Sequence, residues 1–451
     1  MGMHEWDAET EALADQVIEY VGWRLSEPEI QLDRSATLEE LEELAPSLIS
    51  ETGNPTSVVM AQFTEVIAHR VISVDSPRFL SFIPAAPTKA SMLFDAVVSA
   101  SSLNGTSWLE AAGTVHAENQ VLRFLADLAG FPEGAGGCFV SGGSAANLSA
   151  LVVARDLCRA RVGDGRRLRF LASDEAHSSV VNTAHIVDVD VVAVRTRNGR
   201  LVGEDVAAVI AADPEPETIA AVIATAGTTN AGIVDDLAGV GAAARSIGAW
   251  FHVDGAYGAA GLLTPMVRGR YEGIELADSF IVDPHKWLFA PFDCAALVYR
   301  RPGLARPVHT QDASYLDSIH AVPDQWNPTD YAYHLTRRAR GLAIWFSLAV
   351  HGVAAYRAAV ESALRIARYA ARQIDAADHL HLVHEPELSI VIFERTGWDL
   401  GDYDRWAAQL LEDQIGLVLP SKWEGRPVAR LAFLHPDTSE ALVDEILASM
   451  R

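Results

Sequence analysis

The sequence predicts an α/β protein built around a mostly parallel β-sheet, and three observations carry this prediction. Between residues 82 and 340, short runs rich in Val, Ile and Phe alternate with longer alanine-rich runs of helical periodicity. Strands that alternate with helices favour a parallel sheet with helices on its faces. Apolar residues make up 49% of the chain and charged residues 21%, which allows a large buried core. The length of 451 residues suits two or three domains.

Changes in pattern along the chain divide it into three parts. We expect an N-terminal helical segment at residues 1–80, a large domain at 81–342 and a small α+β domain at 343–451. The first part contains runs of helical periodicity at residues 12–25, 37–44 and 56–71. Thr37 is a suitable N-cap for the second of these helices. Prolines after residue 76 mark the change to the large domain.

The strands expected in the large domain are short and apolar. They lie at residues 168–172, 189–194, 220–224, 250–253 and 279–282. The last part begins with a long amphipathic helix at residues 343–376. Strands at residues 389–393 and 428–433 follow, with a helix after Pro436. This order of elements predicts an α+β domain at the C-terminal end.

Charge and cysteine content exclude several classes of protein. Lys and Arg total 35 against 60 Asp and Glu, a formal charge of −25, so we expect no nucleic-acid partner. The three cysteines, Cys138, Cys158 and Cys294, suggest no disulfide framework. The acidic first residues do not resemble a secretory signal, and no run reaches 18 apolar residues. We therefore expect a cytoplasmic protein without a membrane span.

Lys286 is the first candidate for chemistry. It follows an expected strand and precedes Trp287, Leu288 and Phe289. Apolar neighbours desolvate an ammonium group, so we expect a lowered pKa for Lys286, which a Schiff-base lysine needs. The alternative is a lysine whose stem is buried at the edge of a core while its charge reaches water.

Asp254 ends another expected strand, in the sequence HVDGAYG. Ligands of open α/β sheets bind at the carboxyl ends of strands, and a buried carboxylate there needs a cationic partner. A protonated pyridine nitrogen would serve, because an Asp in that role makes pyridoxal phosphate an electron sink. Gly255, Ala256 and Gly258 leave room for a flat ring. The alternative is a strand-end Asp that caps a turn.

Three further motifs lie at strand-to-loop junctions. In SGGSAANL, Gly143 and Ser144 open a strongly helical run, and the N–H groups of a helix N-terminus bind anions. In SDEAHSS, His177 could stack on an aromatic ring or transfer a proton. In TAGTTN, the hydroxyls of Thr228 and Thr229 could serve a polar ligand. Taken singly, these motifs also fit an N-cap, a structural histidine and a turn.

Other catalytic classes find no support in the motifs. His252 and Asp254 are neighbours on one strand face, but neither HExxH nor CxxC is present, so we expect no metal. The GxSxG motif of α/β-hydrolases is absent as well. The remaining motifs together describe one site with an anion cradle, a ring-stacking histidine, a carboxylate and a Schiff-base lysine.

In these motifs the chain resembles the group II, pyridoxal-phosphate-dependent amino-acid decarboxylases of fold type I, the family of aromatic-L-amino-acid decarboxylase. The resemblance extends over residues 76–345 and rests on SDEAHSS, HVDGAYG and PHKW, in that order. It implies a seven-stranded, mostly parallel sheet flanked by helices in the large domain. It also implies pyridoxal 5'-phosphate as the cofactor and a homodimer with shared active sites.

The resemblance assigns roles to matching positions. Lys286 would bind the cofactor as a Schiff base, Asp254 would pair with the pyridine nitrogen, and His177 would stack on the ring opposite Ala256. The residues expected around the phosphate and the other polar groups of the cofactor are Gly143, Ser144, Thr229, Asp283 and His285. Asp283 stands where relatives commonly carry Asn.

The implied activity is decarboxylation of an L-amino acid, aromatic or related, to the amine, through an external aldimine and a quinonoid. Relatives carry a catalytic tyrosine on a mobile loop after the lysine, and Tyr315 stands at the matching place. Related aldehyde synthases typically carry Phe there, so Tyr315 favours plain decarboxylation. Two alternatives keep the same site: oxidative deamination to an aldehyde that depends on decarboxylation, and elimination on an S-cysteinyl-type substrate. A third alternative, a non-catalytic paralogue, is disfavoured by the retained site residues.

Candidate substrate contacts follow from the same resemblance. In relatives the substrate side chain meets residues of the second subunit, which correspond here to Phe79, Phe82, Ala85 and Trp108. Their rings suggest an aromatic substrate, and they could equally be core residues. His116 replaces a Glu of the family pattern, which points to an altered substrate or outcome, or to drift in a packing helix.

Overall fold

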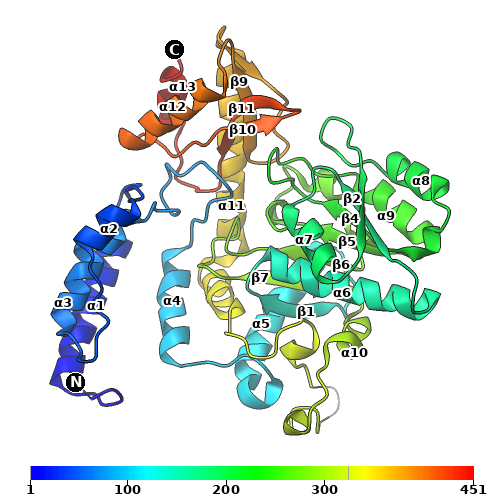
Figure 1. Cartoon of the computed structure of the whole chain (residues 1–451), viewed down its shortest axis with the longest axis horizontal. Helices are drawn as coiled ribbons and strands as arrows, with labels where there is room; N and C mark the ends of the chain where they lie inside the picture. Colours follow the sequence, from blue (N-terminus) through cyan, green and yellow to red (C-terminus); the bar gives the residue numbers. More distant parts are fainter. Residues whose placement is uncertain (1, 323–324) are drawn as a thin grey trace.

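The computed structural model describes residues 2–322 and 325–451, and its centre is a seven-stranded sheet (Figure 1). The strands are β1 (Gly136–Val140), β2 (Arg169–Ser173), β3 (Asp190–Val194), β4 (Ile219–Thr225), β5 (Trp250–Asp254), β6 (Ser279–Val282) and β7 (Ala295–Tyr299). Their order is β1-β7-β6-β5-β4-β2-β3. β7 is antiparallel to both of its neighbours, and the pairs from β6 to β3 are parallel. The predicted mostly parallel, seven-stranded sheet is confirmed.

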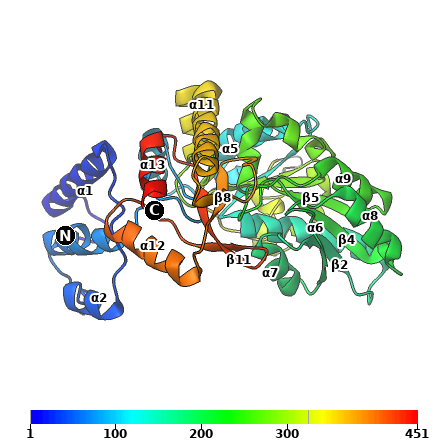
Figure 2. The ribbon, with the colours of Figure 1, turned by 90° about the horizontal axis from the view of Figure 1, so that it is seen from above.

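Helices cover both faces of this sheet, as the view from above shows (Figure 2). They are α5 (Trp108–Leu128), α6 (Gly143–Val162), α7 (Ser178–Ile186), α8 (Gly203–Ala212) and α9 (Leu237–Ser246), and the short α10 (Arg306–His309) follows β7. Helix α4 (Lys89–Ala100) packs instead against α11 (Gly341–Asp375), to the side of the sheet. All residues of β4 are buried. Successive side chains point to opposite faces, so Val222 joins the hydrophobic cluster of α5, α8 and α9, whereas Ile223 joins that of α6 and α7. Burial on both faces explains why the strands read as continuous apolar runs.

The N-terminal helices form an arm that stands apart from the sheet domain (Figures 1 and 2). They are α1 (Ala8–Ser26), α2 (Leu38–Leu44) and α3 (Thr56–Gln62), and none of them contains a buried residue. Thr37 caps α2 in a capping box with Glu40, which confirms the predicted N-cap. The arm is therefore held as helices by local signals, while its apolar side chains remain uncovered.

The helix predicted for residues 56–71 is confirmed as far as Arg70, but it is α-helical only in its first half. After α3 the chain passes into a π-helical turn at Phe63–Ile67 and a 3₁₀ turn at Ala68–Arg70. The hydroxyl of Thr64 donates to the carbonyl of Met60 at 2.9 Å, a back-bond of the kind that bends helices. The β-branched residues of this stretch also have low helix propensity, which the hydrophobic pattern alone does not register.

The C-terminal part begins with the long helix α11 (Gly341–Asp375), which is interrupted at Gly352. An antiparallel sheet of order β10-β11-β9-β8 follows. The strands of this sheet are β8 (Leu380–Leu382), β9 (Ile390–Arg395), β10 (Ser421–Trp423) and β11 (Arg426–Ala432), and the helices of this part are α12 (Leu400–Glu412) and α13 (Glu440–Ala448). By length and composition alone α11 could cross a membrane, but a core helix passes the same test, and Val360, Leu364 and Ile374 lie in the main core. The division predicted after residue 342 falls in the first turn of α11 and stays a prediction.

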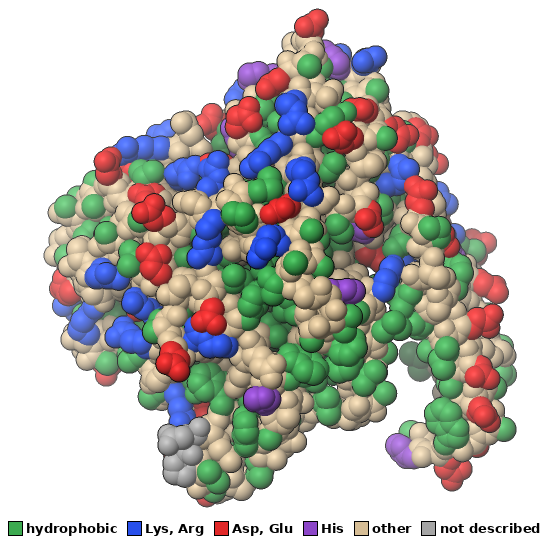
Figure 3. Space-filling model, turned by 180° about the vertical axis from the view of Figure 1, so that it is seen from behind, with side chains coloured by type: hydrophobic (Ala, Val, Ile, Leu, Met, Phe, Trp, Pro, Cys, Tyr) green, Lys and Arg blue, Asp and Glu red, His purple; other side chains and the backbone are tan. Residues whose placement is uncertain are grey.

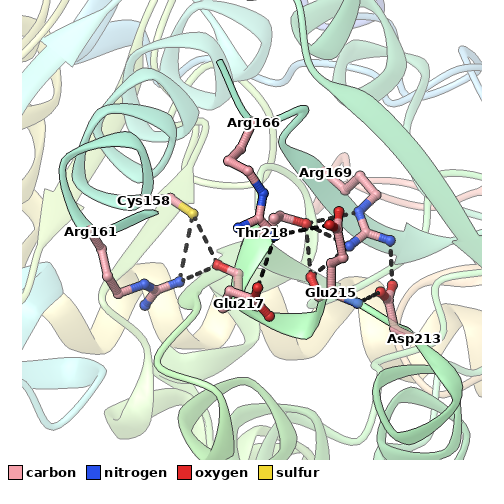
Figure 4. A network of polar contacts seen from close by, with 8 residues as sticks. All are labelled: Cys158, Arg161, Arg166, Arg169, Asp213, Glu215, Glu217 and Thr218. Carbon is pink, nitrogen blue, oxygen red and sulfur yellow. Dashed lines mark hydrogen bonds and ion pairs between the residues drawn. The ribbon is translucent and has the colours of Figure 1, made fainter. Parts of the chain in front are cut away.

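A polar network ties the beginning of β2 to the segment before β4 (Figure 4). Arg169, the first residue of β2, donates to the hydroxyl of Thr218 and to the carboxylate of Asp213. Arg166 pairs with Glu215 and Glu217 at 3.1 and 2.9 Å. These contacts hold the strands together at their amino ends, so the carboxyl ends are left to the loops that build the site.

Candidate active site

A cavity of about 280 Å³ lies where the loops after β1, β2, β4, β5 and β6 meet. The carboxyl ends of strands are where open α/β sheets bind ligands. The predicted site residues that line it are Gly143, Ser144, His177, Thr229, Asp254, Ala256, Asp283, His285 and Lys286. The other lining residues are Ser141, Gly142, Ala145, Asn147, Ser179, Thr225, Gly227 and Tyr257. The topology thus brings together five segments that are far apart in the sequence.

The N-terminus of α6 forms the anion cradle. The N-cap residue Gly142 is extended and has no side chain to cap α6. The N–H groups of the first turn have no intrahelical partner, and Asp283 is the side chain that accepts from one of them, the N–H of Gly143. A Cβ atom added to Gly143 would lie 3.0 Å from Asp283 Oδ2 and 3.1 Å from the Cβ of Ala256. A side chain at position 143 would therefore fill the cradle. Ser144 is exposed at the same turn and adds a hydroxyl.

Asp254 ends β5 and is held by two donors. Its Oδ1 accepts the N–H of Ala256 at 3.1 Å, and its Oδ2 accepts from Asn147 Nδ2 at 2.9 Å. The side chain is buried, and no ion pair with it occurs among the residues that the structure describes. A buried carboxylate in this state suits a cationic group of a ligand.

His177 follows β2 and lies on the rim of the cavity, with its side chain exposed. Its Nδ1 lies 2.8 Å from the hydroxyl of Ser179 and accepts the N–H of Ser179 at 3.2 Å. His177 is thereby the N-cap of α7. The structural and the functional interpretation of this histidine are compatible, because capping uses Nδ1 and leaves Nε2 to the cavity.

The predicted sign of the pKa shift at Lys286 is wrong. Burial alone would lower the pKa of Lys286, but Asp283 Oδ2 lies 2.9 Å from its Nζ, and this carboxylate, with Asp254 as a weaker influence, raises the pKa above its ordinary value. Trp287, Leu288 and Phe289 are buried as expected. Their desolvating effect is outweighed by the carboxylate three residues earlier.

Asp283 links this lysine to the anion cradle. Its Oδ2 also accepts the N–H of Gly143 at 3.2 Å, and its Oδ1 is buried without a hydrogen-bond partner. His285 Nε2 lies 3.6 Å from Asp283 Oδ2. Burial lowers the pKa of His285, so the ring is neutral at pH 7 and does not offset the carboxylate charge. Asp283 therefore competes with an incoming phosphate for the same N–H group.

The threonine pair after β4 is divided between two roles. Thr228 is buried, and its hydroxyl accepts the N–H of Ile233 at 3.1 Å, which holds the turn. Thr229 is exposed and lines the cavity. Only Thr229 is therefore placed to meet a ligand.

Tyr315 and the substrate candidates lie outside this cavity in the single chain. Tyr315 is 71% exposed in the segment between α10 and α11. Phe79 packs with Leu32 and Leu417 in a separate hydrophobic cluster, as the core interpretation of this residue predicts. Ala85 is also buried.

The other three substrate candidates are accessible to a second molecule. Phe82 is exposed, and Trp108 is half-buried at the start of α5. His116 is exposed on α5, where its Nε2 lies 3.1 Å from Gln120 Nε2. Their predicted contacts with substrate require a second subunit and stay predictions.

Sequence reasoning missed several residues of the site and its surroundings. Asn147 and Ser179 are buried polar residues beside Asp254 and His177, and a polar residue in the alanine-rich start of α6 was an available signal. Arg430 lies in β11, where burial lowers its pKa to about 10. Its guanidinium donates to the carbonyls of Thr229 and Asn230. No local pattern places Arg430 here, because it comes from the C-terminal sheet.

A lysine, a buried carboxylate, a histidine and an uncapped helix N-terminus around one cavity define an enzyme site for an anionic, ring-bearing cofactor that reacts with amines. Comparison with known proteins identifies the family. The pyridoxal-dependent decarboxylase conserved domain matches residues 39–396, so the chain belongs to that family. The protein is a pyridoxal-phosphate-dependent carboxy-lyase that acts on an amino acid.

Relatives agree with this assignment, and a solved structure agrees with the fold. The chain is 28% identical to an aromatic-L-amino-acid decarboxylase of Bacillus atrophaeus, over 97% of this chain and 93% of that protein. It is 26% identical to a 4-hydroxyphenylacetaldehyde synthase of Rhodiola rosea, over 76% of this chain and 72% of the relative. The crystal structure of Oryza sativa TDC with PLP and tryptamine superimposes with a TM-score of 0.89, over 98% and 97% of the two chains, at 22% identity. The predicted fold is confirmed.

The residues of the cavity fit pyridoxal phosphate. The cradle at Gly143 would receive the phosphate, Asp254 would hold the proton of the pyridine nitrogen, and Lys286 would bind the aldehyde carbon. When bound, this cofactor draws electrons from a bond at the α-carbon of the amino acid. Asp283 must give up its contact with Lys286 for that linkage to form, because only the neutral amine is a nucleophile.

Proposed function

We propose that the protein decarboxylates an L-amino acid with an aromatic or related side chain and releases the corresponding amine. The observation that carries this proposal is the match to the Bacillus atrophaeus aromatic-L-amino-acid decarboxylase over nearly the whole length of both chains. Phe82 and Trp108 support it, because they offer aromatic surface to a second molecule. Large apolar rings with a few polar groups are typical walls of a pocket for an aromatic ligand.

Tyr315 supports the amine as the product. In this proposal its hydroxyl delivers the proton that replaces CO2 at the α-carbon, with His177 Nε2 as a relay on the cavity rim. The exposure of Tyr315 requires that its loop close over a cavity before it acts. Closure would also exclude water from the reaction.

An aldehyde product is the alternative that the Rhodiola rosea relative raises. The sequence also pointed to an altered outcome at His116, which is exposed on α5 and would meet a substrate only in the site of a second subunit. Elimination on an S-cysteinyl-type substrate is the other diverted outcome. Both remain outcomes of the experiment that follows.

The test is mass spectrometry of the products after aerobic incubation of the cofactor-loaded protein with a pool of L-amino acids and S-cysteinyl conjugates. We expect an amine lighter by one CO2 than an aromatic amino acid that is consumed. An amine from a non-aromatic amino acid would overturn the substrate class and keep the reaction. An aldehyde with peroxide, or a thiol with pyruvate, would overturn the product. A Lys286→Ala variant is the control for non-enzymatic conversion.

We also propose that two copies form a homodimer through the N-terminal arm. Figure 3 shows the arm standing off the body, with hydrophobic side chains on the adjoining face of the body. On the arm, Ile18 is 69% and Trp23 50% exposed. On the body, Leu93 and Val97 of α4 are each 52% exposed. Apolar surface of this extent on both parts suits a second copy that covers both.

Sedimentation of the holoenzyme tests the dimer. We expect twice the chain mass of 48.6 kDa, and an Ile18→Asp variant that dissociates at lower dilution than the wild type. Ile186→Asp is the matched control, because Ile186 is 57% exposed on α7, away from the arm. A monomeric wild-type protein would refute the proposal.

A cytoplasmic location is proposed as well, and it is supported by Cys138, Cys158 and Cys294, which are free and buried.

A further inference from the structure

A chain of buried hydrogen bonds lies behind Asp254 and takes no part in the roles assigned above. Trp250 Nε1 donates to Ser279 Oγ at 2.8 Å, and Ser279 Oγ lies 2.7 Å from His252 Nδ1. His252 Nε2 lies 2.8 Å from Asn147 Oδ1. Trp250, Ser279, His252 and Asn147 are all buried. This hydrogen-bonded chain therefore runs through the interior from the amino end of β5 to the first turns of α6.

This chain of hydrogen bonds divides at Asn147. Its Nδ2 donates to Asp254 Oδ2 at 2.9 Å and to Ser179 Oγ at 2.9 Å. Ser179 Oγ in turn lies 2.8 Å from His177 Nδ1. One amide group thus contacts the carboxylate expected at the pyridine nitrogen and, through one hydroxyl, the histidine on the cavity rim.

The direction of every bond in this chain follows from the chemistry of its members. Asp254 is a carboxylate and can only accept, so the amide of Asn147 must present its NH₂ group to Asp254 and its oxygen to His252. His252 Nε2 must then carry a proton. Trp250 can only donate, so the hydroxyl of Ser279 accepts from Trp250 and gives its own proton to His252 Nδ1.

The state of His252 agrees with this direction. Burial lowers the pKa of His252 to about 4, and Asp254 offsets only part of that effect. A neutral imidazole carries one N–H group, and here it lies at Nε2. Each donor in the chain therefore has one acceptor, and no other arrangement satisfies all of them.

The same logic continues to His177. Ser179 accepts from Asn147, so its hydroxyl proton is directed to His177 Nδ1. The N–H of Ser179 points at the same atom at 3.2 Å. Two donors at Nδ1 leave no proton there, so the neutral ring of His177 carries its proton on Nε2, the nitrogen that capping leaves to the cavity.

We propose that Asn147 is a positioning residue that couples Asp254 to His177: its amide orients the carboxylate and, through Ser179, holds His177 in the Nε2–H tautomer. The proposal holds whichever amino acid the enzyme decarboxylates, because it concerns the protein alone. It predicts that substitutions at Asn147 and at Ser179 have different effects on the affinity for the cofactor. A residue that only stabilises the fold would show no such difference.

The first measurement is the tautomer of His177 in the holoenzyme, by ¹⁵N NMR of protein labelled in the histidine rings. The His177 signals are assigned by their loss in a His177→Asn variant. We expect protonation at Nε2 alone in the wild type. In Asn147→Ala and Ser179→Ala the backbone N–H at position 179 still faces Nδ1, so we expect a rise in the fraction protonated at Nδ1 with the Nε2–H form still the larger. Ser178→Ala is the matched control, because Ser178 is the adjacent serine with an exposed side chain, and the ring should stay as in the wild type.

The second measurement is the dissociation constant of pyridoxal phosphate, by titration of protein from which the cofactor has been removed. Asn147→Ala removes one hydrogen bond to the Asp254 carboxylate, so we expect the constant to rise about 10- to 100-fold, the factor that corresponds to one hydrogen bond to a charged group. Ser179→Ala leaves that bond intact, so the constant should change by less than about twofold.

Two results would overturn the proposal. One is a wild-type His177 protonated at Nδ1, which would contradict the donors and acceptors assigned to these hydrogen bonds. The other is a Ser179→Ala variant that weakens cofactor binding as much as Asn147→Ala. The contact of Asn147 with Asp254 and its contact with Ser179 would then not act separately. If Asn147→Ala does not fold, the tautomer and the dissociation constant of Ser179→Ala still decide between these outcomes.

Discussion

Replacing Asp283 by Asn isolates the charge that raises the pKa of Lys286. The substitution keeps the shape of the side chain and removes the carboxylate that lies 2.9 Å from Nζ. A hydrogen bond to a charged group contributes about 1.5–3 kcal/mol, which corresponds to a factor of about 10 to 100 in an equilibrium constant. We expect Asp283→Asn to lower the pKa of Lys286, because burial is then opposed only by the weaker influence of Asp254.

Competitive acetylation as a function of pH measures this pKa in the cofactor-free protein. The chain has three lysines, Lys89, Lys286 and Lys422, so each is resolved by peptide mass spectrometry and two serve as internal references. Below its pKa the reactivity of Lys286 should rise about 10- to 100-fold in the variant. Asp278→Asn is the matched control, because Asp278 pairs with Arg301 and not with the site. An unchanged Lys286 profile in Asp283→Asn would refute the electrostatic account.

Three other substitutions or conditions test the remaining parts of the structure. Tyr315→Phe should lower the rate of amine formation by about 100-fold or more, which is the usual contribution of a general acid, and should divert product toward aldehyde. Mass spectrometry with a peroxide assay quantifies both products. An unchanged rate of amine formation would show that Tyr315 takes no part in the chemistry. The pKa of His252 is lowered from 6.5 to about 4 in the folded chain, so the unfolded chain binds the proton first, and about 3 kcal/mol of stability present above pH 6.5 should be lost as the pH falls to about 4. Urea unfolding at several pH values checks this, and a His252→Asn variant should show a flatter profile. Glu118→Ala should destabilise the protein by about 3–5 kcal/mol in thermal unfolding, because it leaves the buried guanidinium of Arg337 without its carboxylate partner. The neutral, isosteric Glu118→Gln should lose less stability. An equal loss of stability in the two variants would show that charge is not the cause.

Much of the fold could be predicted because burial leaves a periodic record in the sequence. The strands β2, β4, β5 and β6 are buried on both faces, so they appear as short apolar runs, whereas the edge strand β3 is largely exposed or half-buried. The predicted bounds of all five agree with the structure to within about two residues. β1 and β7 were not among the expected strands. β1 begins with two glycines and β7 with two alanines, and such residues do not distinguish a strand from a loop or a helix.

The candidate site was predictable to the extent that its residues stand at strand ends. Gly143, His177, Asp254 and Lys286 each follow a strand closely, and parallel strands bring their carboxyl ends to one edge of the sheet. Tyr315 and the substrate candidates are different, because nothing local states which subunit they face. Their placement depends on an assembly that one chain does not contain.

The sequence by itself determined which chemical groups the site has and, through the order of strands and helices, that they meet. It did not determine how those groups act on one another. The pKa of Lys286 is raised because a carboxylate lies within hydrogen-bond distance, although the apolar neighbours in the sequence predict the opposite. Asn147 joins Asp254 and His177 because the first turns of α6 lie beside the end of β5 and the start of α7. Electrostatic and hydrogen-bond energies depend on distances of a few ångströms between distant segments, and only the tertiary structure sets those distances.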